Sequence, residues 1–272
     1  MPDAPVPPNF RANAFAGVAD DYVRYRLPYP AAMLDDLAAA ARVPPGGRLL
    51  DLACGTGRVA LAIADRFDEV WAVDLEPQMV EAGRLQAARR GVTNVRWSVG
   101  QVEDFVAPAG GFDLVTVGEA FHRLDRPRVA ALAFGWLKPG GAFATLGTIS
   151  LTDGEAPWRR VLASVVRDCI GVPARRLGAP NATLAEEIAD ERRVLAAAGF
   201  EAIASRDFGF PHEWTLAELL GNLRSTSTLS RAALADRHAA FEAALTAALL
   251  AYDPSGRYAE TVGCGYTLAR KP

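Results

Sequence analysis

Cysteine, lysine and histidine are all scarce in this sequence. Among 272 residues there are three cysteines (Cys54, Cys169 and Cys264) and three histidines, and only two of the 29 basic residues are lysines. The cysteines stand far apart and form no C-x-x-C pair, which argues against a disulfide framework and against a cysteine-based zinc or redox site. We therefore expect a reducing, cytoplasmic compartment and no bound metal.

Long apolar runs and an excess of positive charge are absent as well. No stretch of about 18 consecutive apolar residues occurs, so we expect no membrane span. The first ten residues, MPDAPVPPNF, contain four prolines, lack the features of a signal peptide and are expected to be loosely attached. The formal net charge of −3 gives no overall field that attracts a phosphate backbone. We expect a small-molecule partner, with no nucleic acid and no membrane.

Between residues 46 and 150 the apolar pattern alternates between strands and helices. Short apolar segments at 48–53, 69–74, 94–100, 112–118 and 141–150 predict strands, and segments at 58–67, 76–88 and 127–137 predict helices. Strands that alternate with helices form βαβ units and a mainly parallel sheet. The sequence therefore predicts an α/β fold, with a cofactor-binding core at 46–150.

Helical patterns dominate on either side of this core. We predict helices at 15–25, 31–41, 155–169, 184–198, 215–223 and 231–252, and further strands at 201–208 and 261–269. Residues 1–45 are assigned to an N-terminal helical lid segment. Residues 151–272 are assigned to the remaining core strands with helical substrate-cap insertions. Such additions would cover the edge of the sheet and keep water from the reaction.

The first predicted strand ends in a glycine-rich turn, DLACGTG, at residues 51–57. Gly55 and Gly57 permit a tight turn and let a ligand approach the backbone closely. Asp74 ends the second predicted strand, where a carboxylate can accept hydrogen bonds from both hydroxyls of a ribose. A glycine turn and an acid at the ends of neighbouring strands together predict an adenosine-containing cofactor.

Two cofactors compete for this turn. The spacing Gly55-x-Gly57-x-x-Ala60 also satisfies the dinucleotide fingerprint, which keeps NAD open. Asp51 argues against NAD, because its carboxylate would face a pyrophosphate and like charges at short range repel. The same carboxylate suits a ligand that carries an ammonium group.

These motifs resemble those of the class I S-adenosylmethionine-dependent methyltransferases. DLACGTG is similar to their first motif, with Ala53 where many members have glycine; VDLEPQMVEAGR is similar to the second and SVGQVEDF to the third, and GEAFHRLD and KPGG follow. The resemblance covers roughly residues 22–150 and points to a subgroup that acts on small molecules. It implies a Rossmann-like, seven-stranded, mainly parallel sheet with an antiparallel last strand, helical lid additions, and S-adenosylmethionine as the cofactor.

The resemblance also assigns residues to the cofactor. Asp74 would bind the ribose, Met79 and Gln101 would lie near the adenine, and Tyr25 or Arg26 would lie near the cofactor carboxylate. Arg123 stands where the subgroup pattern A-F-H-W has tryptophan, so no substrate contact is carried over there. The expected cofactor residues are Tyr25, Arg26, Asp51, Ala53, Gly55, Gly57, Asp74, Leu75, Met79, Gln101, Val102 and Glu119.

Methyl transfer from a sulfonium depends mainly on alignment of the reactants and exclusion of water. A general base is useful where the nucleophile is protonated near pH 7, and His122 is the candidate, with a structural histidine as the alternative. Trp158, His212 and Trp214 are candidates to contact the substrate, with ordinary packing as the alternative.

The sequence therefore predicts an enzyme that moves a methyl group by in-line displacement from S-adenosylmethionine to an oxygen, nitrogen or carbon atom of a small molecule. A specialised metabolite is the expected substrate. Two alternatives stay open, an NAD-dependent oxidoreductase and a non-catalytic binding module with the methyltransferase fold. Both a monomer and a homodimer are compatible with the sequence.

Overall fold

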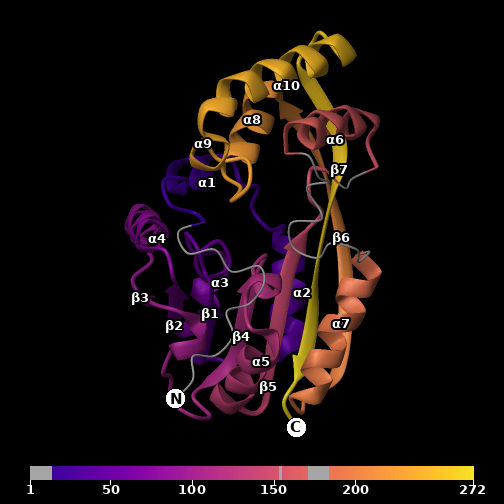
Figure 1. Cartoon of the computed structure of the whole chain (residues 1–272). Helices are drawn as coiled ribbons and strands as arrows, with labels where there is room; N and C mark the ends of the chain where they lie inside the picture. The colour runs from indigo at the N-terminus through magenta and orange to yellow at the C-terminus, as the bar shows by residue number, and fades with distance from the viewer. Residues whose placement is uncertain (1–13, 153–154, 171–183) are drawn as a thin grey trace, which may run out of the picture.

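A seven-stranded sheet forms the centre of the molecule (Figure 1), with the strand order β3-β2-β1-β4-β5-β7-β6. It is seen in a computed structural model that describes residues 14–152, 155–170 and 184–272, so the expectation for the first ten residues lies outside it. Neighbours among β1 to β5 are parallel, whereas β7 is antiparallel to both β5 and β6. The predicted α/β sheet with an antiparallel last strand is confirmed. The strands are β1 (Gly47–Leu52), β2 (Phe67–Asp74), β3 (Val95–Val99), β4 (Phe112–Gly118), β5 (Leu137–Thr148), β6 (Glu201–Thr215) and β7 (Arg257–Arg270).

Helices cover both faces of the sheet, because successive residues of its buried strands point to opposite sides. On one face, Leu37 of α2 packs in the same apolar cluster as Leu49 of β1. On the other face, Val129 of α5 and Leu195 of α7 pack in a cluster with Leu50. The helices of the described residues are α1 (Ala19–Tyr25), α2 (Ala31–Ala41), α3 (Ala60–Ile63), α4 (Pro77–Arg90), α5 (Arg126–Trp136), α6 (Pro157–Ile170), α7 (Leu184–Ala197), α8 (Leu216–Arg224), α9 (Arg231–Leu234) and α10 (His238–Tyr252).

The last two strands extend beyond the rest of the sheet as a two-stranded ribbon. β5 pairs with β7 only as far as Thr148 and Cys264, whereas the pairing of β6 with β7 continues to Thr215 and Arg257. Helices α6, α8, α9 and α10 gather at this end of the molecule (Figure 1). We call these four helices, with residues 151, 209–215, 225–230 and 257–263, the helical cap. Its separate apolar core consists of Leu151, Trp158, Leu162, Val166, Trp214, Leu219, Leu223, Leu229, Leu234, Phe241, Leu245, Leu249 and Tyr258.

Some expectations for the flanking segments were wrong. α2 and α7 pack against the sheet as core helices, whereas we expected both in the lid. β6 continues through residues 209–215, beyond the strand predicted at 201–208, and it includes Pro211. β6 is the edge strand and pairs with β7 alone, and an edge position tolerates proline. The helix expected at 231–252 is interrupted at Ala235, whose φ is +48°.

A buried ion pair ties the helical cap together. The Nη2 group of Arg159 on α6 donates to Oε1 of Glu260 on β7 at 2.7 Å, and the Nε group of Arg159 donates to the other oxygen. Nε1 of Trp214 donates to the same carboxylate at 2.5 Å. The two charged side chains are only 2% and 3% exposed. No motif in the sequence pointed to this pair.

Candidate functional site

A cavity lies at the carboxyl edge of the parallel strands, which is where ligands bind in open α/β sheets. Residues that follow β1, β2 and β3 line it together with the end of β4, and Phe15 and Tyr22 line it from the N-terminal segment. It has an empty volume of about 860 Å³ and opens to solvent. Eight of the twelve expected cofactor residues lie on its wall, namely Ala53, Gly55, Asp74, Leu75, Met79, Gln101, Val102 and Glu119.

Gly55 and Gly57 have different structural roles in the turn. A Cβ built on Gly55, whose φ is +55°, would meet no atom closer than 4.0 Å, so the backbone here faces open space in the cavity. A Cβ on Gly57, whose φ is +77°, would lie 2.6 Å from the ring of Trp97 on β3. Gly57 is therefore required for packing behind the cavity, and Gly55 leaves room for a ligand within it.

Asp74 is held at the cavity wall by the backbone. Its Oδ2 accepts a hydrogen bond from the N–H group of Gly55 at 2.7 Å, and its Oδ1 accepts one from Glu76 at 2.8 Å. Burial raises the pKa of the Asp74 carboxyl, and these two hydrogen bonds oppose that shift. Each carboxylate oxygen has further acceptor capacity. The side chain is thus fixed on the wall with free acceptor capacity, and its contact with a ribose stays a prediction.

Asp51 lies beneath the glycine turn and not on the cavity wall. Its Oδ1 accepts from the hydroxyl of Thr116 at 2.7 Å, its Oδ2 accepts from the N–H group of Ala60 at 3.1 Å, and the residue is 1% exposed. Burial raises the pKa of this carboxyl to about 7. This placement disagrees with the expectation that Asp51 meets an ammonium group directly. The carboxylate instead holds the turn to β4 and to the start of α3.

Glu119 stands on the cavity wall at the end of β4 with a φ of +54°, an uncommon conformation for a residue with a side chain. Its Oε2 lies 2.9 Å from Nη1 of Arg58 and 3.4 Å from Nη1 of Arg26, and the hydroxyl of Thr148 donates to its Oε1. Burial alone would raise the pKa of Glu119, but the two guanidinium charges outweigh it and lower the pKa to about 2. Arg58 was not singled out from the sequence, although it directly follows the glycine motif.

Tyr25 and Arg26 lie behind the wall, where they join α1 to the cap. Nε of Arg26 donates to the hydroxyl of Ser225 at 2.8 Å, just after α8. The ring of Tyr25 occupies the space beside Gly221, where a Cβ would lie 2.3 Å from it. Neither residue lines the cavity, so contact of Tyr25 or Arg26 with a cofactor carboxylate stays a prediction.

Arg123 bridges the two segments that cover the cavity. Its guanidinium lies 4.9 Å from the ring centre of Phe15, and its Nη1 donates to the hydroxyl of Ser227 at 3.3 Å. The ring of Phe15 packs edge-on against Tyr22, with their centres 6.2 Å apart. The N–H group of Gly17 donates to the side chain of Gln78 on α4 at 2.7 Å, which fixes this N-terminal segment. The cover therefore draws on the N-terminal segment and the cap.

Residues 49–141 match a family model described as a methyltransferase domain. An O-methyltransferase of ubiquinone biosynthesis from Xanthomonas axonopodis pv. citri is 37% identical over 118 residues, 43% of this chain and 46% of that protein. The nocamycin O-methyltransferase of Saccharothrix syringae is 32% identical over 176 residues, 57% of this chain and 60% of that protein. The chain thus spans about half the length of the curated relatives it matches.

The match falls on the strands and turns that build the cavity, from β1 to the start of β5. Residues 49–141 are therefore similar to a methyltransferase domain. The fold is shared with the solved YcgJ protein from Bacillus subtilis, which superposes with a TM-score of 0.58 at 20% identity, over 89% of this chain and 99% of that one. The similarity to a methyltransferase domain favours S-adenosylmethionine over NAD as the cofactor.

Within the matched segment, His122 is exposed and is not among the residues that line the cavity, although Ala120, Arg123 and Leu124 are. Partial desolvation by the surrounding chain, together with the charge of Arg123, lowers the pKa of its imidazole. Such an imidazole binds a proton weakly near neutral pH. Its place outside the cavity wall disfavours the expected role as a base.

Trp158, His212 and Trp214 lie inside the helical cap and not on the cavity wall. Nε1 of Trp158 donates to the carbonyl of Ala259 at 3.3 Å, and the ring of His212 packs edge-on against Trp214 with their centres 4.5 Å apart. These contacts favour the packing interpretation of all three.

The described residues also contain no group of three His, Cys, Asp or Glu side chains that could hold a metal ion. In addition, no described helix is long and apolar enough to cross a membrane.

Proposed function

We propose that the protein transfers a methyl group from S-adenosylmethionine to a small molecule. The observation that carries this proposal is the cavity in which the open backbone of Gly55 and the carboxylate of Asp74 face the same space. The residues present fit the cofactor, since Gly55 leaves room against the backbone and Asp74 retains acceptor capacity for a ribose. Met79 and Val102, which line the same cavity, supply apolar contacts of the kind that an adenine ring needs.

When bound, S-adenosylmethionine supplies an electrophilic methyl group on a sulfonium. An acceptor held in line with the carbon–sulfur bond would take this methyl group, with S-adenosylhomocysteine as the other product. The chain's own contribution is to hold the acceptor in line and to exclude water. Phe15, Tyr22 and Arg123 would provide the cover, and the Glu119–Arg58 pair would keep the wall rigid.

The acceptor is proposed to be an oxygen that ionises near neutral pH without help from a base. Glu119, with a pKa of about 2, is paired with arginines, and His122 lies outside the wall. Arg123 places a positive charge on the wall, which would favour an anionic oxygen. The O-methyltransferase relatives support oxygen, and the nocamycin relative supports a specialised metabolite. The free state of all three cysteines supports the cytoplasm as the compartment.

Calorimetric titration with S-adenosylmethionine, S-adenosylhomocysteine and NAD, run in parallel, tests the cofactor. We expect the first two to bind and NAD to give no heat. Binding of NAD alone would contradict the proposal and favour hydride chemistry. Binding of S-adenosylmethionine without transfer to any phenol or enol in a panel of small acceptors would favour the non-catalytic binding module.

A further inference from the structure

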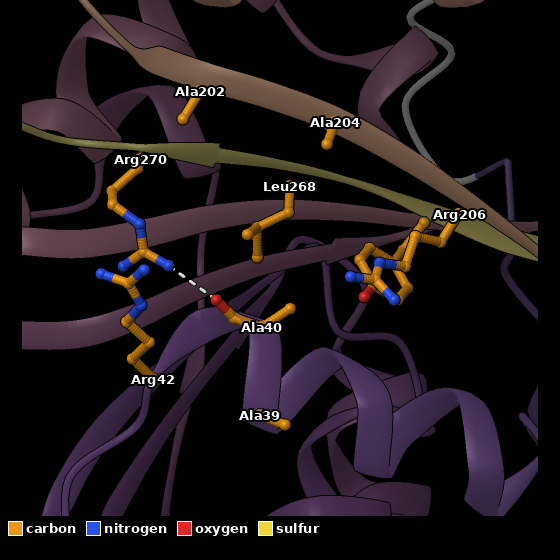
Figure 2. Close-up of a pocket in the computed structure, with 9 residues that line it drawn as sticks. Ala39, Ala40, Arg42, Ala202, Ala204, Arg206, Leu268 and Arg270 are labelled. Atoms are coloured by element: carbon orange, nitrogen blue, oxygen red, sulfur yellow. Dashed lines mark hydrogen bonds between the residues drawn. The ribbon is translucent and has the colours of Figure 1, made fainter.

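A second hollow lies where α2 crosses the last two strands of the sheet. It has an empty volume of about 700 Å³ and shares no residue with the cofactor cavity. Three arginines line it, Arg42 after α2, Arg206 on β6 and Arg270 on β7. Figure 2 shows the guanidinium groups of Arg42 and Arg270 close together at one end, with Arg206 at the other. We call this hollow the arginine groove.

The two neighbouring arginines differ in how far their donors are used. Arg270 donates to the carbonyls of Ala40 at 2.6 Å, Gly140 at 2.7 Å and Ala41 at 3.4 Å. Those three bonds leave two of its five N–H donors uncommitted. The guanidinium of exposed Arg42 makes no hydrogen bond or ion pair with any residue that the structure describes. At this end the groove therefore offers two cations with unused donors.

Capping of α2 does not account for Arg42. Cations at a helix C-terminus interact favourably with its last carbonyls, but Arg270 already donates to Ala40 and Ala41 there. Arg42 also has a φ of +55°, a conformation in which glycine or asparagine is the usual residue at such a position. A long cationic side chain at this place adds nothing to the helix end that Arg270 lacks.

Arg42 and Arg270 also repel each other. Burial lowers the pKa of the Arg270 guanidinium, and the positive charge of Arg42 lowers it further. The nearest acid on α2, Asp36, is committed elsewhere, because it pairs with Arg206 at 2.9 Å and accepts from the hydroxyl of Tyr266. A bound anion would remove this repulsion.

The wall between the cations is built from small side chains. Ala39 and Ala40 of α2 face Ala202 and Ala204 of β6 across Leu268 (Figure 2). Methyl groups leave space above the sheet and give an apolar surface beside the charged end. The groove thus suits a ligand with an anionic group at one end and a compact apolar or mixed body.

We propose that the arginine groove binds a small molecule that carries a phosphate group. Arg42 and Arg270 hold the phosphate, since planar guanidinium groups donate paired hydrogen bonds to phosphate oxygens and a dianion matches two cations. The body of the ligand lies on the alanines and extends toward Arg206. The site is separate from the cofactor cavity and does not depend on methyl transfer.

Calorimetry of the whole chain with inorganic pyrophosphate tests the site. The titration is run at low ionic strength, because salt screens charge interactions. We expect pyrophosphate to bind the wild type and to bind the Arg42→Gln variant at least tenfold more weakly. Gln keeps a polar side chain on an unbranched stem and leaves the backbone requirement of the position unchanged, while it removes the charge and the guanidinium fork. Arg42→Lys is expected to give an intermediate affinity. Arg90→Gln, which removes an exposed arginine near the end of α4, is the matched control and is expected to match the wild type.

Orthophosphate and ADP, titrated in the same way, distinguish a lone phosphate from a nucleotide, and saturating S-adenosylhomocysteine should leave the pyrophosphate affinity unchanged. Absence of binding at millimolar pyrophosphate would overturn the proposal, as would equal binding by wild type and Arg42→Gln. Binding of a hexaglutamate peptide in place of pyrophosphate would also overturn it and would indicate an acidic protein partner.

Discussion

The α/β core and the helical cap each contain a carboxylate neutralised by arginine, which is partly buried in the core and buried in the cap. In the cap, Arg159 and Trp214 both donate to Glu260, which is 3% exposed and does not line the cavity. In the core, Glu119 lies on the cavity wall at a strained positive φ, and it pairs with Arg58 and Arg26, which do not line the cavity. The same ion-pair chemistry therefore organises a core in one region and a binding wall in the other.

The two regions meet over the cavity. Arg26 and Arg123, which belong to the N-terminal segment and the core, donate to Ser225 and Ser227 of the cap-side turn between α8 and α9. Changes in the cap should therefore act on stability, whereas changes on the wall should act on binding. Variants of the two regions test whether stability depends on the cap and binding on the cavity wall.

Removal of one partner of the cap pair should cost the most stability. Arg159→Met leaves the charge of Glu260 buried and unpaired, and we expect a loss of about 3–5 kcal/mol in the free energy of unfolding. Chemical denaturation measures it. The double variant Arg159→Met, Glu260→Gln should recover most of the loss. A single variant that unfolds within about 1 kcal/mol of the wild type would show that the pair is solvated.

The buried acid of the core should make stability depend on pH. The pKa of Asp51 is raised on folding from 3.8 to about 7, so the folded state binds the proton more tightly. The stability that the protonated carboxyl contributes is fully present below about pH 4, and it is lost as the pH rises through about 7. Over this range the free energy of unfolding of Asp51→Asn should therefore rise relative to that of the wild type, by up to about 4 kcal/mol. Denaturation at several pH values measures the difference, and a constant difference would contradict the buried state of Asp51.

On the cavity wall, a change at Asp74 should act on binding. Asp74→Ala removes the acceptors proposed for the ribose, and we expect a loss of about 1.5–3 kcal/mol, or roughly tenfold to a hundredfold, in S-adenosylhomocysteine affinity. Calorimetry on the folded variant measures it. Asp104→Ala, at an exposed acid that pairs with Arg128, is the control and should bind normally. Unchanged affinity of Asp74→Ala would remove the ribose assignment.

The smallest effect is expected at His122. Because it lies outside the wall, His122→Ala should change kcat by less than about threefold, whereas loss of a general base typically costs 10²–10⁴-fold. The pH profile of kcat/KM should follow the ionisation of the acceptor, so two acceptors of different pKa should give two different profiles. A profile that keeps one enzyme-derived pKa for both acceptors would restore a base to the mechanism.

Asp51 and Asp74 show which parts of the site can be predicted from the sequence. Both were correctly placed at the ends of neighbouring strands, because hydrophobic alternation is a local signal. Which of them faces the ligand depends on β4, which pairs with β1 so that Thr116 lies opposite Asp51 and bonds to it. That pairing joins residues 65 positions apart, and no local pattern contains it.

The sequence by itself determined the α/β alternation, the glycine turn and the acid after the second strand, because strand periodicity and turn chemistry are properties of neighbouring residues. Only the tertiary structure decided that α2 and α7 cover the sheet, that His212 lies within β6, and that Arg58 meets Glu119. It also decided that Arg42 and Arg270 come together in one groove. Each of these contacts joins distant segments, so its geometry depends on how the strands and helices pack.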